Sequence, residues 1–161
     1  MDDAYQVSHY QTNVLAFKEV AKWLDSLKEM GIYDNTRIII VSDHGHDLGQ
    51  FGLVDERGND LEYLTPLLMV KDFNERGFSV SEDFMTNADV VPFALQGVIQ
   101  DARNPFTGNV LDGHEKNGNL KFRINPKTDI QPDDNVFYPG DWYSVNGDIY
   151  DINNWTYLGN W

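Results

Sequence analysis

Apolar residues recur every three or four positions along the first part of the chain, between residues 7 and 30, with charged residues at the other positions. This pattern predicts an amphipathic helix that packs one face against a sheet. Gly31 follows directly and is a typical residue for ending a helix. The short turn Tyr33–Asn35 then leads into a second apolar segment. The apolar stripe consists of Val14, Phe17, Val20 or Ala21, Leu24 and Leu27.

The second apolar segment, Ile38–Val41, shows no alternation and is rich in β-branched residues. It predicts a short strand that is covered on both faces, as strands inside parallel sheets are. The polar segment Ser42–Asp47 follows with no linker and contains two aspartates and two histidines. Ligands of open α/β sheets bind just beyond the carboxyl ends of the strands. We therefore expect these four side chains to lie where such folds carry out their chemistry.

Asp43 and His44 are the candidate metal ligands of this segment. Aspartate offers an anionic oxygen and histidine a neutral nitrogen, and such a mixed set suits Zn²⁺ or Mn²⁺ better than Ca²⁺. Neighbouring residues of a regular strand point to opposite sides, so the two can share one ion only where the strand has become a loop. Gly45 permits the sharp turn and close backbone approach that this requires. The alternative is that Asp43 caps a turn and His44 is a partly buried polar residue.

Residues 48–64 are rich in glycine, asparagine and aspartate and predict a long irregular connection of the kind that often carries function. Thr65 and Pro66 then introduce the apolar run Leu67–Val70, which predicts a neighbouring strand, since proline is tolerated at a strand's first position. Lys71 ends this strand. If the two strands are parallel, Lys71 lies near the metal site and could stabilise an anionic substrate. The alternative is a surface lysine that caps the strand.

Residues 87–100 predict a second helix, with Pro92 in its first turn, where the missing N–H does no harm. Thr86 or Asn87 is the expected cap, and Asp89 is favourable to the helix dipole. The order of helix, buried strand, second strand and helix predicts an α/β fold, in which a partial layered sheet carries flanking helices.

The last part of the chain, residues 113–161, is dense in aromatic residues. Trp142–Val145 and Asp148–Ile152 flank Asn146–Gly147, and this pattern predicts two short strands joined by a hairpin turn. The α/β part is therefore followed by a small antiparallel β-hairpin region. Aromatic surfaces can bind sugars by stacking, and the alternative is that these rings simply cover the preceding layer.

The composition excludes several classes of function. The net charge is -14, from 26 acidic and 12 basic residues, and so much negative charge repels nucleic acid and anionic membranes. The absence of cysteine rules out disulfides, thiolate ligands and a cysteine nucleophile in these residues. No run approaches the ~18 apolar residues of a membrane-spanning helix, and the first residues lack a signal-peptide pattern. We expect this chain to be soluble.

The string TRIIIVSDHGHDLGQFG at residues 36–52 resembles the T-x-(hydrophobic run)-S-D-H-G-x-x-L-G-x-x-G segment of the alkaline-phosphatase-like superfamily. This superfamily includes sulfatases, lipoteichoic acid synthases, phosphoethanolamine transferases and nucleotide pyrophosphatases. The resemblance extends through TPLLMV at 65–70 and NADVVPFAL at 87–95, where Phe93 replaces a usual threonine. It covers roughly residues 8–112. Ile149–Ile152 is similar to a Leu-Tyr-Asp-Leu string in the last small sheet of sulfatase-like chains.

The resemblance implies a metal-dependent hydrolase or transferase, for example a sulfatase or phosphoglycerol transferase, that acts on phosphate or sulfate esters. Asp43 and His44 would hold one divalent metal ion, Zn²⁺ or Mn²⁺. His46 stands where many relatives have another residue, so it is a further ligand, a support for the ligands or a surface residue. The superfamily often adds a late metal- or substrate-binding histidine, for which His114 is the candidate here. A solvated turn histidine is the alternative for His114.

The superfamily also uses a threonine, serine or formylglycine nucleophile from an earlier segment, and nothing before Asn35 matches that segment. We therefore expect residues 1–112 to be the C-terminal half of a catalytic domain, without a catalytic nucleophile and inactive alone. Its expected partner is the missing N-terminal half, and an uncovered sheet surface would favour self-association. The resemblance is compatible with a membrane-anchored parent that has an extracytoplasmic catalytic domain. The alternative is a non-catalytic module that binds glycans or a partner chain through the aromatic tail.

Overall fold

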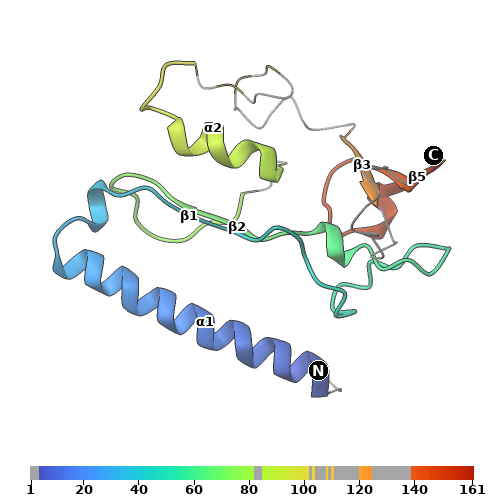
Figure 1. Cartoon of the computed structure of the whole chain (residues 1–161), viewed down its shortest axis with the longest axis horizontal. Coiled ribbons are helices and arrows are strands. Elements are labelled where there is room, and N and C mark those ends of the chain that lie inside the picture. The colour runs from blue at the N-terminus through green and yellow to red at the C-terminus, as the bar shows by residue number, and fades with distance from the viewer. Residues whose placement is uncertain are drawn as a thin grey trace, which may run out of the picture. The chain divides into compact units, whose positions relative to one another are not determined.

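The computed structural model describes residues 4–81, 85–101, 103, 108, 110, 120–124 and 139–161 (Figure 1). These residues form two compact units. The first contains the chain up to Ser42 together with Leu67–Ser79, and the second contains Asp43–Pro66 and the described residues from Val80 onward. His114 and the predicted boundary between residues 112 and 113 lie outside the described residues, so both remain predictions.

The first unit begins with helix α1 (Ala4–Glu29), close to the predicted range. The helix ends in a Schellman motif, as Gly31 suggested. The N–H of Gly31 donates to the carbonyl of Lys28 at 2.9 Å, and the N–H of Ile32 donates to that of Leu27 at 3.0 Å. Gly31 has a φ of +69°, which glycine adopts without strain. Of the predicted stripe, only Leu27 is fully buried and Phe17 is exposed.

Strands β1 (Ile38–Val41) and β2 (Leu68–Lys71) form a two-stranded sheet in this unit. Both strands were predicted, but the expected parallel sheet is wrong, because the strands pair antiparallel with Ile38 opposite Lys71 and Val41 opposite Leu68. A parallel pair needs a crossover, usually through a helix. The connection 42–67 contains only one 3-10 turn, so the chain returns as in a long hairpin. Val41 is exposed, and β1 is therefore not covered on both faces along its whole length.

The second helix lies in the second unit and is shorter than predicted. It starts as the 3-10 turn η3 (Asn87–Asp89) and continues as α2 (Val90–Leu95), with Pro92 in the first turn. Thr86 is the cap: the Asp89 carboxylate accepts from both the N–H and the hydroxyl of Thr86 at 2.8 Å. Gly97 follows with a φ of +77°, which a right-handed helix cannot include, and the predicted continuation to residue 100 is therefore wrong.

The C-terminal part forms a three-stranded antiparallel sheet in the order β3 (Leu120–Ile124), β4 (Asp141–Val145) and β5 (Trp155–Asn160). The predicted first hairpin strand corresponds to β4. The predicted second strand at 148–152 is wrong, because this segment forms turns and the 3-10 helix η5 (Ile152–Asn154). The Asp151 side chain accepts from the N–H of Asn153 at 3.0 Å and so favours a turn over a strand.

The core of the second unit joins the irregular connection to the C-terminal sheet. Leu53 and Leu61 from the connection and Tyr143 from β4 are buried, and Ile152 and Trp155 pack against them. The aromatic tail thus covers the connection that follows the Asp-His segment. The predicted class is confirmed: the chain is mixed α/β and contains helices and small antiparallel sheets (Figure 1).

Candidate functional site

The strand becomes a loop directly before Asp43. The N–H of Ser42 donates to the carbonyl of Leu67 at 3.0 Å, and the Ser42 hydroxyl accepts from the N–H of Leu67 at 2.7 Å. This pair extends the ladder of β1 and β2 by one step and closes it. Asp43 and His44 therefore have the loop geometry that two neighbouring residues need in order to approach one ion.

Gly45 lies against the backbone of the 3-10 helix η2 (Glu62–Leu64). Its N–H donates to the carbonyl of Tyr63 at 2.9 Å. A Cβ at this position would lie 2.1 Å from the carbonyl oxygen of Glu62 and 2.9 Å from that of Thr65. The close backbone approach predicted for Gly45 is confirmed, and only glycine fits there.

The imidazole of His44 is held in one tautomer. Its Nδ1 lies 2.6 Å from the carbonyl oxygen of Gly45. A carbonyl can only accept, so Nδ1 carries a proton, and in the neutral imidazole Nε2 then presents a lone pair. The ring stacks on Tyr63, with 4.1 Å between centroids and 14° between planes, and the Tyr63 hydroxyl lies 3.2 Å from Nε2. His44 is thus oriented as a metal-binding histidine is, with one nitrogen hydrogen-bonded to backbone and the other able to bind.

Asp43 lies next to this lone pair. Its side chain is 87% exposed, and one carboxylate oxygen is 3.7 Å from Nε2 of His44. Two ligands bound to one Zn²⁺ lie about 3.4 Å apart in an ideal tetrahedron and at most about 4.2 Å apart. The pair therefore fits a shared ion. The other oxygen accepts from the N–H of His44 at 3.0 Å, so Asp43 also has the turn-capping role that was the alternative.

Two residues that the sequence analysis did not select support this loop. Glu62 is 2% exposed, and its carboxylate accepts from the N–H of Leu48 at 3.2 Å and of Phe51 at 2.7 Å. Tyr63 is the second, through its contacts with His44 and Gly45. The signal in the sequence for a buried Glu62 was its position between Leu61 and the following apolar residues. No local pattern indicated the role of Tyr63.

The loop concentrates negative charge. Burial, together with the charges of Glu62 and Asp47, raises the pKa of Asp60 above its usual value of 3.8. A region whose carboxylates repel one another attracts cations. In the described residues, however, no group of three or more His, Asp or Glu side chains is arranged to hold a metal ion. Within the described residues, the Asp43–His44 pair therefore offers at most two of the ligands that a metal ion needs.

The other selected residues do not join this pair. Nδ1 of His46 lies 2.7 Å from a carboxylate oxygen of its neighbour Asp47. The ammonium of Lys71 donates to the carbonyl of Tyr33 and, at 3.0 Å, to that of Thr36. The antiparallel pairing also places Lys71 at the start of β1 rather than at its end. The condition attached to its substrate role, a parallel strand, is therefore not met.

A polar network fixes the connection to the C-terminal sheet. The Tyr143 hydroxyl donates to the Asp55 carboxylate and accepts from the Asn59 side chain at 3.0 Å. Burial and the hydrogen bond to Asp55 raise the pKa of Tyr143 to about 12. Burial also opposes ionisation of Asp55, but the hydrogen bonds from Tyr143 and Asn59 outweigh it and lower the pKa of Asp55. These hydrogen bonds to Asp55 and Asn59 hold the irregular connection against strand β4.

A second carboxylate of this network is Asp141, which is 4% exposed. It accepts from Asn160 at 2.7 Å, and a guanidinium nitrogen of Arg57 lies 3.0 Å away. The hydrogen bond from Asn160 and the charge of Arg57 hold the pKa of Asp141 below its usual value, against the effect of burial. These contacts and those of Tyr143 brace the connection that also contains η2, against which Gly45 packs.

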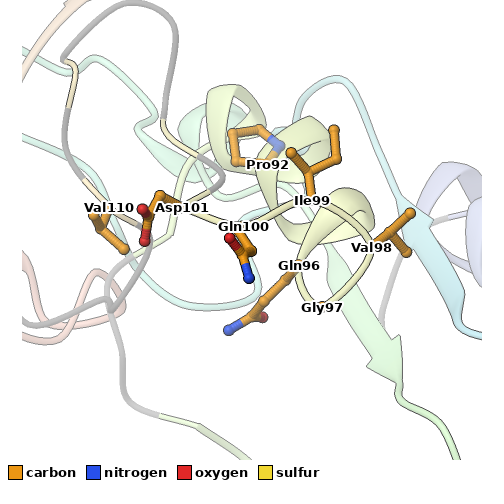
Figure 2. A pocket seen from close by; sticks show the side chains of 8 residues that line it. All are labelled: Pro92, Gln96, Gly97, Val98, Ile99, Gln100, Asp101 and Val110. Carbon is orange, nitrogen blue, oxygen red and sulfur yellow. The ribbon is translucent and has the colours of Figure 1, made fainter.

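A separate hollow of ≈ 300 Å³ lies beside the end of α2, and Figure 2 shows the side chains that line it. Its lining residues are Pro92, Gln96–Asp101 and Val110. None of the selected site residues lines it, and its one ionisable side chain is Asp101. The hollow offers no set of groups for metal or acid–base chemistry.

Comparisons with known proteins find partial similarity over somewhat less than half of this chain. The chain is 32% identical over 77 residues to the extracellular sulfatase SULF-1 homolog of Drosophila melanogaster. The aligned segment covers 47% of this chain and 7% of that protein. It is 36% identical over 72 residues to the multifunctional alkaline phosphatase superfamily protein PehA of Trinickia caryophylli, 44% of this chain and 14% of that protein. No family model and no solved structure matches.

The chain thus spans a small fraction of the length of these curated relatives. The similarities support the relationship to the sulfatase and alkaline-phosphatase-like superfamily that the motif indicated. No helix in the described part of the chain has the length and apolar content that crossing a membrane requires.

Proposed function

We propose that this chain is the part of a sulfatase-like or phosphotransferring enzyme of the alkaline-phosphatase-like superfamily that provides Asp43 and His44 to one divalent metal ion. The observation that supports this best is the fixed tautomer of His44, with Nδ1 on the Gly45 carbonyl and Nε2 3.7 Å from an Asp43 oxygen. A neutral nitrogen and an anionic oxygen at this spacing suit Zn²⁺ or Mn²⁺.

The bound ion would supply Lewis acidity toward a phosphate or sulfate ester and offset the charge of the transferred group. The residues of this chain have simpler tasks. Gly45 holds the His44 proton at Nδ1, and Tyr63 holds the plane of the imidazole. Asp43 adds negative charge at an exposed position, where it can meet the ion without the cost of burying an unpaired carboxylate.

The nucleophile and the remaining metal ligands are proposed to come from another part of the parent protein, which is the first partner of this chain. The similarity to a protein described as an extracellular sulfatase supports an extracytoplasmic catalytic domain in the parent. His46, which lies two residues after His44, is proposed to support the site from beside Asp47. The substrates of the parent are proposed to be phosphate or sulfate esters.

The test is calorimetric titration of the chain with Zn²⁺ and with Mn²⁺. Two ligands do not close a site, so we expect weak binding that Asp43→Ala and His44→Ala both abolish. His9→Ala is the matched control, because His9 lies on α1 in the first unit, and it should leave the binding unchanged. Nanomolar affinity that His46→Ala removes and Asp43→Ala retains would contradict the assignment of the ligands.

A second candidate function, glycan binding, is favoured by the aromatic rings of the C-terminal sheet. Trp142 and Trp161 stack with 5.8 Å between centroids and 15° between planes, and Trp161 is 60% exposed. Exposed flat rings of this kind stack on sugar rings. Titration with neutral oligosaccharides should quench tryptophan emission in the wild-type chain and not in Trp161→Ala. If millimolar sugar leaves the emission of the wild-type chain unchanged, this candidate is wrong.

A further inference from the structure

The side chain of Asn87 reaches from the start of the second helix to the candidate metal-binding loop. Its amide nitrogen donates to the backbone carbonyl of Asp43 at 2.9 Å. Both residues belong to the second unit. The sequence favoured Thr86 or Asn87 as the helix cap, and the structure gives that role to Thr86. The Asn87 amide instead contacts a candidate ligand that lies 44 residues earlier in the chain.

The carbonyl that Asn87 contacts belongs to the peptide group that joins the two candidate ligands. The N–H of the same peptide group, that of His44, donates to a carboxylate oxygen of Asp43 at 3.0 Å. A peptide group is planar, so hydrogen bonds to both its carbonyl and its N–H fix its orientation. That orientation sets ψ of Asp43 and φ of His44. These two angles decide how the carboxylate and the imidazole lie relative to one another.

The contact with Asn87 does not compete with an ion for the ligand atoms. The C=O and N–H of a trans peptide group point in opposite directions. Asn87 therefore approaches this peptide group from the edge opposite to the Asp43 carboxylate. It restrains the carbonyl and leaves the carboxylate of Asp43 and the imidazole of His44 to meet a cation.

The start of the helix holds Asn87 in place. Asp89 is 0% exposed, and its carboxylate accepts from the N–H and the hydroxyl of Thr86 at 2.8 Å. The N–H of Asp89 donates to the carbonyl of Thr86 at 2.9 Å, and the N–H of Val90 donates to that of Asn87. Asn87 lies inside this closed turn, so its backbone is fixed by contacts that do not involve its side chain.

We propose that Asn87 is a positioning residue of the Asp43–His44 pair: its amide holds the peptide group between them in the orientation that brings both side chains to one divalent cation. This inference rests on the proposed function, since it assumes that the pair binds an ion. Asn87 is not a ligand in this arrangement. The hydrogen bond is exposed, so water can partly replace it, and its loss should weaken cation binding without abolishing it.

The first measurement needs no metal. A carbonyl carbon is deshielded when its oxygen accepts a hydrogen bond, so the ¹³C signal of the Asp43 carbonyl reports the contact with Asn87. Asn87→Ala removes the donor and should move this signal upfield in the 161-residue chain. Asn87→Asp keeps the shape, suits the start of a helix and has no amide donor, so it should move the signal in the same direction. If either variant leaves the Asp43 signal in place, the inference is wrong.

Two controls separate the contact from a general effect on the fold. Thr86→Ala weakens the helix cap but keeps the Asn87 amide, so the Asp43 carbonyl signal should stay in place. Asn153→Ala removes an exposed asparagine of the same unit, whose amide donates to Asp151 at 2.8 Å, and should also leave the signal in place. A shift in Thr86→Ala as large as in Asn87→Ala would show that the loop responds only to the stability of the helix, and would overturn the inference.

The second measurement is a Zn²⁺ titration of the same chains. Asn87→Ala should bind about 2- to 10-fold more weakly than the wild type, the factor that one net hydrogen bond represents. Asn153→Ala should bind as tightly as the wild type. Equal binding by Asn87→Ala and the wild type would overturn the inference and leave the proposed function standing. If the wild-type chain binds no Zn²⁺, the proposed function fails, whereas the Asp43 carbonyl signal still decides whether Asn87 orients the loop.

Discussion

Gly45→Ala is the substitution whose effect the structure defines most closely. The added Cβ would lie 2.1 Å from the Glu62 carbonyl oxygen, whereas ordinary contacts begin at 3.4 Å, so the loop must move by about 1.3 Å. The obstacle is backbone and not the end of a flexible side chain, so it cannot rotate away. A shift of this size also breaks the 2.9 Å hydrogen bond from Gly45 to Tyr63.

The expected cost follows from these two effects. Overpacking costs about 1–3 kcal/mol, and one lost hydrogen bond costs about 0.5–1.5 kcal/mol. We therefore expect Gly45→Ala to lower the free energy of unfolding of the second unit by about 1.5–4.5 kcal/mol. The assay is urea unfolding followed by tryptophan fluorescence in a Trp23→Phe background. That background leaves only the tryptophans of the second unit, because Trp23 lies on α1.

Gly49→Ala is the matched control. Gly49 has a φ of +62° and open space where a Cβ would be added, so its substitution introduces only backbone strain, about 1–2 kcal/mol. Gly45→Ala should be clearly the less stable of the two and should also weaken Zn²⁺ binding, because the loop that orients His44 has moved. If Gly45→Ala is as stable as Gly49→Ala, the close contact with η2 is not a feature of the folded chain.

Two further predictions concern buried carboxylates. Glu62→Gln replaces one acceptor of a backbone N–H with an amide donor and should cost about 1–3 kcal/mol in the same urea assay; an unchanged unfolding midpoint would show that Glu62 does not close the loop. Asn160 and Arg57 lower the pKa of Asp141 in the folded protein. The ionised carboxylate therefore stabilises the fold fully above its usual pKa of 3.8, and this stabilisation is lost as the pH falls through the lower pKa of the folded protein. Asp141→Asn should therefore flatten the loss of stability in acid, measured by urea unfolding between about pH 5 and pH 2. The exposed Asp148→Asn should leave that slope unchanged, and equal slopes for the wild type and Asp141→Asn would contradict the prediction.

Local sequence patterns gave correct predictions where the structure of an element follows from its own residues. The stripe before Gly31 predicted α1 and its end, and the β-branched run Ile38–Val41 predicted β1. The patterns gave wrong predictions where the structure of a segment depends on its pairing partner or on the geometry of a turn. The apolar run of β1 does not state the direction of its neighbour, and Asp148–Ile152 contains strand-forming residues that the hydrogen bonds of Asp151 hold in a turn.

The sequence by itself determined the chemistry available to this protein. It placed an aspartate, a histidine and a glycine at the exit of an apolar strand, because residue types and their order are local properties. Only the tertiary structure decided how that chemistry is presented. The His44 tautomer, the stacked Tyr63 ring and the buried Glu62 carboxylate depend on η2 returning to Gly45 from a distant part of the chain. A contact between segments so far apart is fixed by packing and backbone hydrogen bonding, which no local pattern encodes.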